Sequence, residues 1–258
     1  MTHQLLRRLL APLVGIVVFL GAWELLVRTQ HVRPFVLRAP SRIVHYLGQQ
    51  AGDYTGAAWV TIQHAMIGTA FALLVALLIG SAMAASSFFE HAAQPVLTLL
   101  QVTPFVAYIA SVVLWLGSGT KPAVFIVALV CMPAFTFATV DGMRGADPAA
   151  RELLASVDAT RWEVLWRLRL PSAMPSLFTT ARYNVGLALI AAYLVEGGNF
   201  ANEGLGAIGK RAAAFNKGDA LWAAVFSMAL LGTISLVLIS VAQRLVMHWH
   251  VSQRRQLR

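Results

Sequence analysis

The sequence has few charged side chains for its length. Charged residues make up 12% of the 258 residues, whereas hydrophobic residues make up 58%. A typical soluble domain carries roughly 25% charged residues, so this chain has too few charges to cover a soluble surface. The mean hydropathy of +0.68 points the same way. The composition therefore argues against a soluble protein and predicts one that crosses the bilayer several times.

Cysteine is also scarce, since Cys131 is the only one in the sequence. A single thiol excludes a disulfide framework and a cysteine-based metal site within one chain. The histidines and carboxylates lack the spacing of a metal site, and the sequence contains no nucleophile elbow. We therefore expect no catalytic residue, no metal site and no bound cofactor in this chain.

Long apolar runs are abundant instead. A helix needs about 20 mostly apolar residues to cross the bilayer core. The sequence predicts six spans, at 12–27, 58–85, 93–116, 122–140, 177–196 and 220–243. Pro104, Pro133 and Arg182 interrupt three of them, which favours a transporter or channel over a simple anchor. The first run resembles a signal peptide but lacks a convincing cleavage site, so we interpret it as a retained span.

The net charge of +9 lies in short segments between the apolar runs. This distribution is typical of residues that flank membrane spans, and it argues against nucleic-acid binding. Six spans place both termini on one side of the membrane. Basic residues are moderately more numerous on that side, which predicts cytoplasmic termini.

The segment 142–176, which we call the inner loop, is too polar to span and too long for a simple connection. We expect it to form two short helices on the cytoplasmic face, the first capped by Asp147 and the second opened by Thr160. Pro171 and Pro175 are expected to end the second helix. The second helix carries tryptophans among arginines. By physical chemistry alone, the inner loop is either an amphipathic segment on anionic lipid or a docking site for a soluble partner.

The inner loop resembles the signature loop of bacterial ABC importer permeases, E-A-A-x-x-x-G, nine residues, then I-x-L-P. Glu152 stands at the glutamate, and 168–171 reads LRLP at the second part of the pattern. Leu153 and Leu154 replace the two alanines, and Asp158 replaces the glycine. Aspartate can adopt the left-handed conformation that glycine provides, at some cost.

Further stretches extend the resemblance over nearly the whole chain, from 1 to 258, which we treat as one permease domain. They look like the nitrate, sulfonate and taurine branch of these permeases: AWELLVR at 22–28, FVLRAPSRIV at 35–44, WLGSG at 115–119 and VEGGNFANEGLG at 195–206. The resemblance implies an all-α fold with about six spans, in a bacterial cell membrane. It also implies an importer, most simply for a small anion, with thiamine-precursor pyrimidines, a passive channel or an energy-coupling scaffold as alternatives.

Permeases of this family work as a pair, with two cytoplasmic ATPase subunits and an external substrate-binding protein. The resemblance therefore implies a second permease copy as partner, and ATP and Mg²⁺ used only by the ATPase. It also implies a set of residues that couple the permease to the ATPase: Glu152, Leu154, Asp158, Ala159, Arg161, Trp162, Leu170 and Pro171.

Polar groups at depth in the membrane are candidates for the substrate pathway. We expect Gln101, Tyr108 and Asn184 to line it, with Gln63 and His64 as further candidates. For each of them, an interhelical hydrogen bond is the competing interpretation, because such bonds are common between membrane helices.

Residues 204–211, GLGAIGKR, match two nucleotide motifs, G-x-G-x-x-G and G-x-x-x-x-G-K. Both matches fail in context, because a membrane helix precedes the run and Arg211 stands where a magnesium-binding hydroxyl is needed. We expect Gly204 and Gly206 to allow a tight turn and close packing at the outer mouth. In the family a similar G-L-G occurs here, which suggests an outer gate or a dock for the binding protein.

The outer segments also carry charge. Glu24 and Glu196 lie near the outer ends of their spans, and we expect either to pair with Arg28 or another outer arginine. The remaining basic residues there mildly favour an anionic substrate.

Overall fold

The fold is a bundle of helices, seen in a computed structural model that describes residues 2–30, 33, 36–198 and 203–247, with side chains from Leu10 onward. All secondary structure in these residues is helical. The long helices are α1 (Thr2–Thr29), α3 (Ala51–Ala85), α4 (Ser87–Val102), α6 (Thr120–Arg144), α9 (Leu170–Glu196) and α11 (Gly218–Val246). The short ones are α2 (Pro40–Gln49), η1 (Phe105–Tyr108), α5 (Ile109–Leu116), α7 (Pro148–Ser156), α8 (Arg161–Val164), η2 (Leu165–Arg169) and α10 (Leu205–Ala214).

Five of the six predicted spans are confirmed, and the third, 93–116, is a bent pair of helices. Within the described residues, five helices are long and apolar enough to cross a membrane, or up to six if a bent pair counts as one span. That pair is Ser87–Val102 followed by Phe105–Leu116, which meet at 86°. Pro104 explains the break, because it forces the preceding Thr103 out of the helical region, to φ −73° and ψ 123°.

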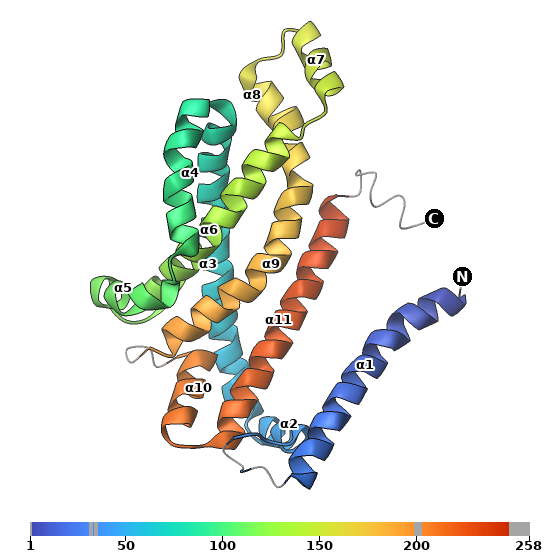
Figure 1. Cartoon of the computed structure of the whole chain (residues 1–258), viewed down its shortest axis with the longest axis vertical. Coiled ribbons are helices and arrows are strands. Elements are labelled where there is room, and N and C mark those ends of the chain that lie inside the picture. The colour runs from blue at the N-terminus through green and yellow to red at the C-terminus, as the bar shows by residue number, and fades with distance from the viewer. Residues whose placement is uncertain (1, 31–32, 34–35, 199–202, 248–258) are drawn as a thin grey trace.

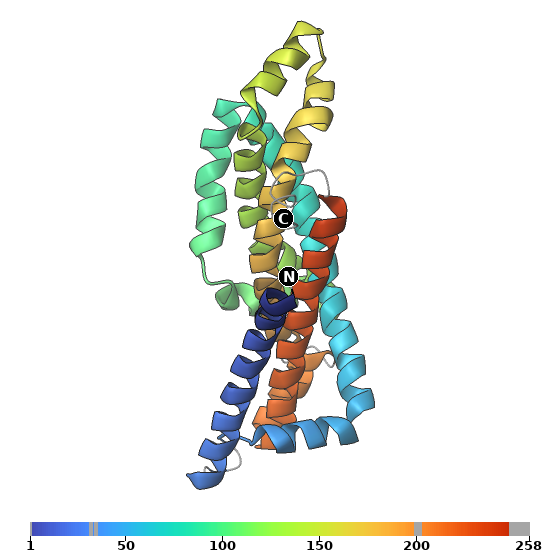
Figure 2. The ribbon, with the colours of Figure 1, turned by 90° about the vertical axis from the view of Figure 1, so that its right-hand side faces the viewer.

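The centre of the bundle is formed by α3, α6 and α9, which lie side by side in Figures 1 and 2. Small buried residues recur along α3 at intervals of three or four: Ala65, Gly68, Ala72, Ala76 and Gly80. A Cβ at Gly80 would lie 2.7 Å from the Cβ of Thr139 on α6. Such a seam of small residues lets two membrane helices approach closely, because lipid supplies no hydrophobic drive for their association.

The two ends of the bundle differ. The helices α7 and α8 project at one end, which we call the loop end, and α2 and α10 lie at the other, which we call the α10 end (Figures 1 and 2). In Figure 1 the helix α1 begins apart from the bundle, about midway along its length, and runs to the α10 end beside α2. Near the α10 end its Trp23 packs edge-on against Trp222 of α11, with ring centroids 5.3 Å apart. The helix α1 thus runs toward the α10 end, and α11 runs back toward the loop end.

Candidate functional site

The inner loop contains the two helices that its caps predict. Asp147 accepts a hydrogen bond from the backbone N–H of Ala149 at 3.0 Å and caps α7. Thr160 and Glu163 form a reciprocal capping box at the start of α8. Each cap satisfies backbone donors that a helix start leaves free. The loop is therefore an ordered structure whose helix starts are encoded locally.

Asp158 adopts the left-handed conformation expected of it, with φ at 53°. It follows the end of α7, where the N–H of Ala159 bonds the carbonyl of Leu154 at 3.0 Å, and that of Asp158 bonds Ala155 at 3.2 Å. This pair of bonds is a Schellman motif, which closes a helix on a left-handed residue. Asp158 thus reverses the chain between α7 and α8 in place of the usual glycine.

The end of the second loop helix was predicted wrongly. Pro171 and Pro175 do not stop it, and the helix runs without interruption from Arg161 to Glu196. Pro171 lacks an N–H for the preceding turn and its ring crowds that turn. The five residues before α9, Leu165–Arg169, adopt a π-helix, whose wider turn accommodates the proline. The second helix of the inner loop is consequently continuous with the span α9.

Several predicted coupling residues are accessible. Glu152, Asp158, Arg161 and Trp162 are exposed, whereas Leu154, Ala159, Leu170 and Pro171 are half-buried. Leu153 on α7, Val157 directly after it and Trp166 beside Trp162 add large apolar side chains that are more than half exposed. The rings of Trp162 and Trp166 contact each other edge-on at 5.6 Å between centroids. Apolar groups exposed beyond the spans are typical of a surface that binds another protein or lipid.

At the opposite end, Gly204 and Gly206 allow close packing as expected. Gly204 has φ at 91° and starts α10. A Cβ on it would collide with the carboxylate of Glu196, and a Cβ on Gly206 would collide with the carbonyl oxygen of Tyr193. Only glycine fits both places, so α10 lies directly against the end of α9.

Glu196 pairs with no arginine among the residues that the structure describes, so this expectation was wrong. Its carboxylate accepts hydrogen bonds from the Thr61 hydroxyl at 2.8 Å and the Gly206 N–H at 3.1 Å. The Nδ1 atom of His64 lies 2.9 Å from the other carboxylate oxygen. Glu24 does pair with Arg28, at 2.7 Å. The polarity of His64 and Glu196 within apolar runs was the only sequence signal of this cluster.

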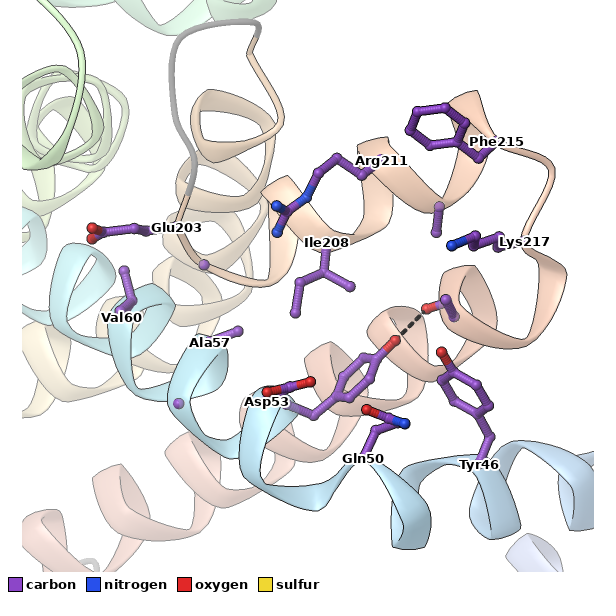
Figure 3. A pocket seen from close by; sticks show the side chains of 15 residues that line it. Tyr46, Gln50, Asp53, Ala57, Val60, Glu203, Ile208, Arg211, Phe215 and Lys217 are labelled. Carbon is purple, nitrogen blue, oxygen red and sulfur yellow. Dashed lines mark hydrogen bonds between the residues drawn. The ribbon is translucent and has the colours of Figure 1, made fainter.

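A cavity of about 650 Å³ opens beside α10. Its walls come from the end of α2, the start of α3, α10 and the start of α11 (Figure 3). Asp53 and Glu203 bring two carboxylates to it, and Arg211 and Lys217 bring two cations (Figure 3). Charges of both signs line this cavity, so the basic excess of the outer segments is not repeated here.

The three predicted pathway residues lie in different surroundings. Asn184 is buried and donates a hydrogen bond from its side chain to the carbonyl of Cys131 on α6, at 3.1 Å. Gln101 is exposed near the end of α4, and Tyr108 is half-buried in η1 beside the bend. Gln63 is exposed on α3. The structure therefore brings Gln101 and Tyr108 near the broken span and gives Asn184 an interhelical bond.

Known proteins resemble this chain along most of its length. The family described as binding-protein-dependent transport system inner membrane component matches residues 49–249. The formylaminopyrimidine transport permease protein ThiX of Halalkalibacterium halodurans is 27% identical over 245 residues, covering 95% of this chain and 97% of that protein. The taurine transport system permease protein TauC of Escherichia coli is 24% identical over 254 residues, covering 95% and 91%.

A solved structure has the same fold. An inward-facing structure of the MetNI methionine ABC transporter superposes with a TM-score of 0.65 at 16% sequence identity. The match covers 74% of this chain and 94% of that chain. At this identity the likeness concerns the fold alone.

Proposed function

Because the chain belongs to the family of binding-protein-dependent transport system inner membrane components, we propose that it is the permease subunit of an ATP-driven importer. The observation that carries the proposal is the inner loop. Its helices α7 and α8 project at the loop end, and the loop presents exposed tryptophans and arginines. The second helix, α8, continues through η2 into α9. A passive channel needs no such docking element, so the loop favours a driven importer over a channel.

The proposed partners follow from the surfaces that the chain leaves open. Two cytoplasmic ATPase subunits bind the inner loops of two permease copies and hydrolyse ATP with Mg²⁺, while this chain is not itself an enzyme. The second copy covers part of the exposed apolar face of the bundle, and lipid covers the rest. An external binding protein delivers substrate at the α10 end. This arrangement places the termini in the cytoplasm and the chain in the inner membrane of a bacterium.

The proposed mechanism is alternating access. Closure of the ATPase dimer moves α7 and α8 through contacts that include Glu152, Arg161 and Trp162. The rigid connection at Pro171 passes this motion to α9, which tilts and switches the pathway between the two sides. The two states of the permease must differ in their interaction with the ATPase, since a partner shifts an equilibrium only through differential affinity.

Two substrate classes are supported by different observations. A small anion such as a sulfonate, taurine or nitrate is supported by the outer basic residues and by the relative that is named for taurine transport. A small pyrimidine is supported by the relative named for formylaminopyrimidine transport, which aligns over 95% of this chain. Binding assays on the partner binding protein, with taurine and with a formylaminopyrimidine, distinguish these classes.

The function is tested by uptake into proteoliposomes that contain the purified complex. We expect uptake to require ATP and the binding protein. Deletion of 152–162 is expected to abolish stimulated ATP hydrolysis, since it removes the docking surface. Asp158→Arg is expected to impair it, since it puts a long cationic side chain at the left-handed turn between α7 and α8. ATP-independent uptake, or normal assembly and stimulation in both variants, would contradict the assignment.

A further inference from the structure

Glu196 is the last residue of α9, and its carboxylate holds three helices together. Its side chain is only 1% exposed. The Thr61 hydroxyl on α3 donates to this carboxylate and also accepts from the N–H of Leu205, the first residue of α10, at 2.9 Å. The N–H of Gly206 donates directly to the carboxylate. We call Glu196, Thr61, His64 and the N–H groups of Leu205 and Gly206 the Glu196 joint.

The joint has a clear electrostatic rationale. A carboxylate is stabilised at the start of a helix, where free N–H groups carry partial positive charge. No lysine or arginine of the described part of the chain pairs with Glu196, so Thr61, His64 and α10 supply its contacts. A buried carboxylate that loses such contacts is costly. The joint therefore keeps α10 attached when α9 changes position.

The helix that ends in Glu196 begins in the inner loop. It runs over 36 residues from Arg161 to Glu196, a length of about 54 Å at 1.5 Å per residue. Its first turn carries Trp162, on the proposed ATPase-binding surface. Its last residue holds α10. Two residues of α10, Ile208 and Arg211, line the cavity described above beside this helix, which we call the outer cavity. One continuous helix thus joins the two ends of the molecule.

We propose that Glu196 is a positioning residue that transmits movement of the inner loop to the walls of the outer cavity. The inference rests on the proposed function as an ATP-driven permease. Movement of α9 pulls on α10 through Gly206 and on α3 through Thr61, so the cavity changes shape with the ATPase. The surface that the binding protein meets therefore depends on nucleotide through this joint.

The test measures the affinity of fluorescently labelled binding protein for the purified complex, without nucleotide and with a non-hydrolysable ATP analogue. The ratio of the two dissociation constants is the coupling between the ends. Glu196→Gln keeps the size of the side chain but removes its charge. We expect the ratio of the two dissociation constants to move toward one by a factor of about five or more, which is the lower range of allosteric couplings. Basal ATP hydrolysis is expected to stay unchanged.

Glu24→Gln is the matched control. The Glu24 carboxylate also accepts a hydrogen bond near the start of a helix, from the N–H of Ser41 on α2 at 3.0 Å, but it lies on α1. Glu24 has no connection to the inner loop through α9. The ratio of dissociation constants in Glu24→Gln should therefore equal that of the wild type. An unchanged ratio in Glu196→Gln, or an equal fall in both variants, would overturn the role of Glu196.

A second variant distinguishes loss of transmission through the Glu196 joint from a general loss of stability. Thr61→Val removes the hydroxyl that links Glu196 to Leu205. If Glu196→Gln fails to assemble, the ratio of dissociation constants is measured in Thr61→Val instead. Both changes break one network, so the double variant should show no larger loss than Glu196→Gln alone. Additive losses would contradict the joint. A wild-type ratio of one would instead refute nucleotide coupling itself, and with it the proposed function.

Discussion

Glu90 and Arg144 form a two-point ion pair at the loop end of the bundle. The Nη1 and Nη2 atoms of Arg144 lie 2.7 and 2.6 Å from the two carboxylate oxygens of Glu90. Arg144 ends α6 and also donates to the carbonyl of Met83 on α3, at 3.3 Å. Since the inner loop follows directly, the pair fixes the base of the loop against α3 and α4.

The first prediction concerns this pair. Arg144→Glu should lower ATP-dependent uptake, because two carboxylates then face each other at the base of the loop. The exchange Glu90→Arg with Arg144→Glu should recover part of the uptake, since it restores opposite charges. Uptake into proteoliposomes measures both variants, and an exchange no better than the single change would contradict a role for the pair.

Asp158 gives the second prediction. Asp158→Gly should preserve stimulated ATP hydrolysis, because glycine adopts the left-handed conformation freely. Asp158→Val should destabilise the Schellman motif by about 1–2 kcal/mol relative to Asp158→Gly, the cost of a left-handed L-residue. Limited trypsin digestion at the exposed Arg151 and Arg161 reports the order of the loop. Faster cleavage is expected in the valine variant alone, and equal rates in both variants would count against the motif.

The third prediction concerns ATPase docking by Trp162. An interface tryptophan contributes about 2 kcal/mol or more when it is a hot spot, so Trp162→Ala should weaken ATPase binding roughly 30-fold. Trp59→Ala is the control, because Trp59 is equally exposed but lies in α3 toward the α10 end. Equilibrium binding of the ATPase to the detergent-solubilised permease measures the difference. Equal affinity of all three proteins would remove Trp162 from the docking surface.

The fourth prediction concerns Gly206. Gly206→Val should impair uptake, because its Cβ collides with the backbone carbonyl of Tyr193, which cannot rotate away. Overpacking of this kind costs about 1–3 kcal/mol. Assembly with the ATPase should be spared, since the loop end is distant. Gly52→Ala is the control, as a Cβ there meets nothing within 4 Å, and normal uptake by Gly206→Val would refute close packing at this turn.

The fifth prediction separates pathway residues from structural ones. Asn184→Leu should lower the stability of the bundle by about 0.6 kcal/mol, the average for interhelical hydrogen bonds in membranes, and leave the KM for uptake unchanged. Gln101→Ala and Tyr108→Phe should instead change the KM, if both line the pathway. Thermal unfolding and uptake kinetics are measured together. A changed KM in the Asn184 variant alone would reverse the assignment.

Much of the fold followed from local patterns. Apolar runs of span length predicted the membrane helices, and Pro104 marked the break in the third. The caps at Asp147 and Thr160 and the left-handed Asp158 were readable because each depends on residues a few positions apart. Pro171 was misread, since a proline ends most helices and the π-helical turn that accommodates it has no simple sequence signature.

The sequence by itself determined the class of protein, its spans and its inner loop, because hydropathy and capping act over a few residues. Only the tertiary structure decided how the loop end and the α10 end of the bundle are joined. Thr61 and Glu196 are 135 residues apart in the chain yet share a hydrogen bond. Each is a polar residue in an apolar run, and the sequence alone does not indicate that the two are partners. Close packing of α3, α9 and α10 buries the carboxylate, and a buried carboxylate is stable only with polar partners such as Thr61.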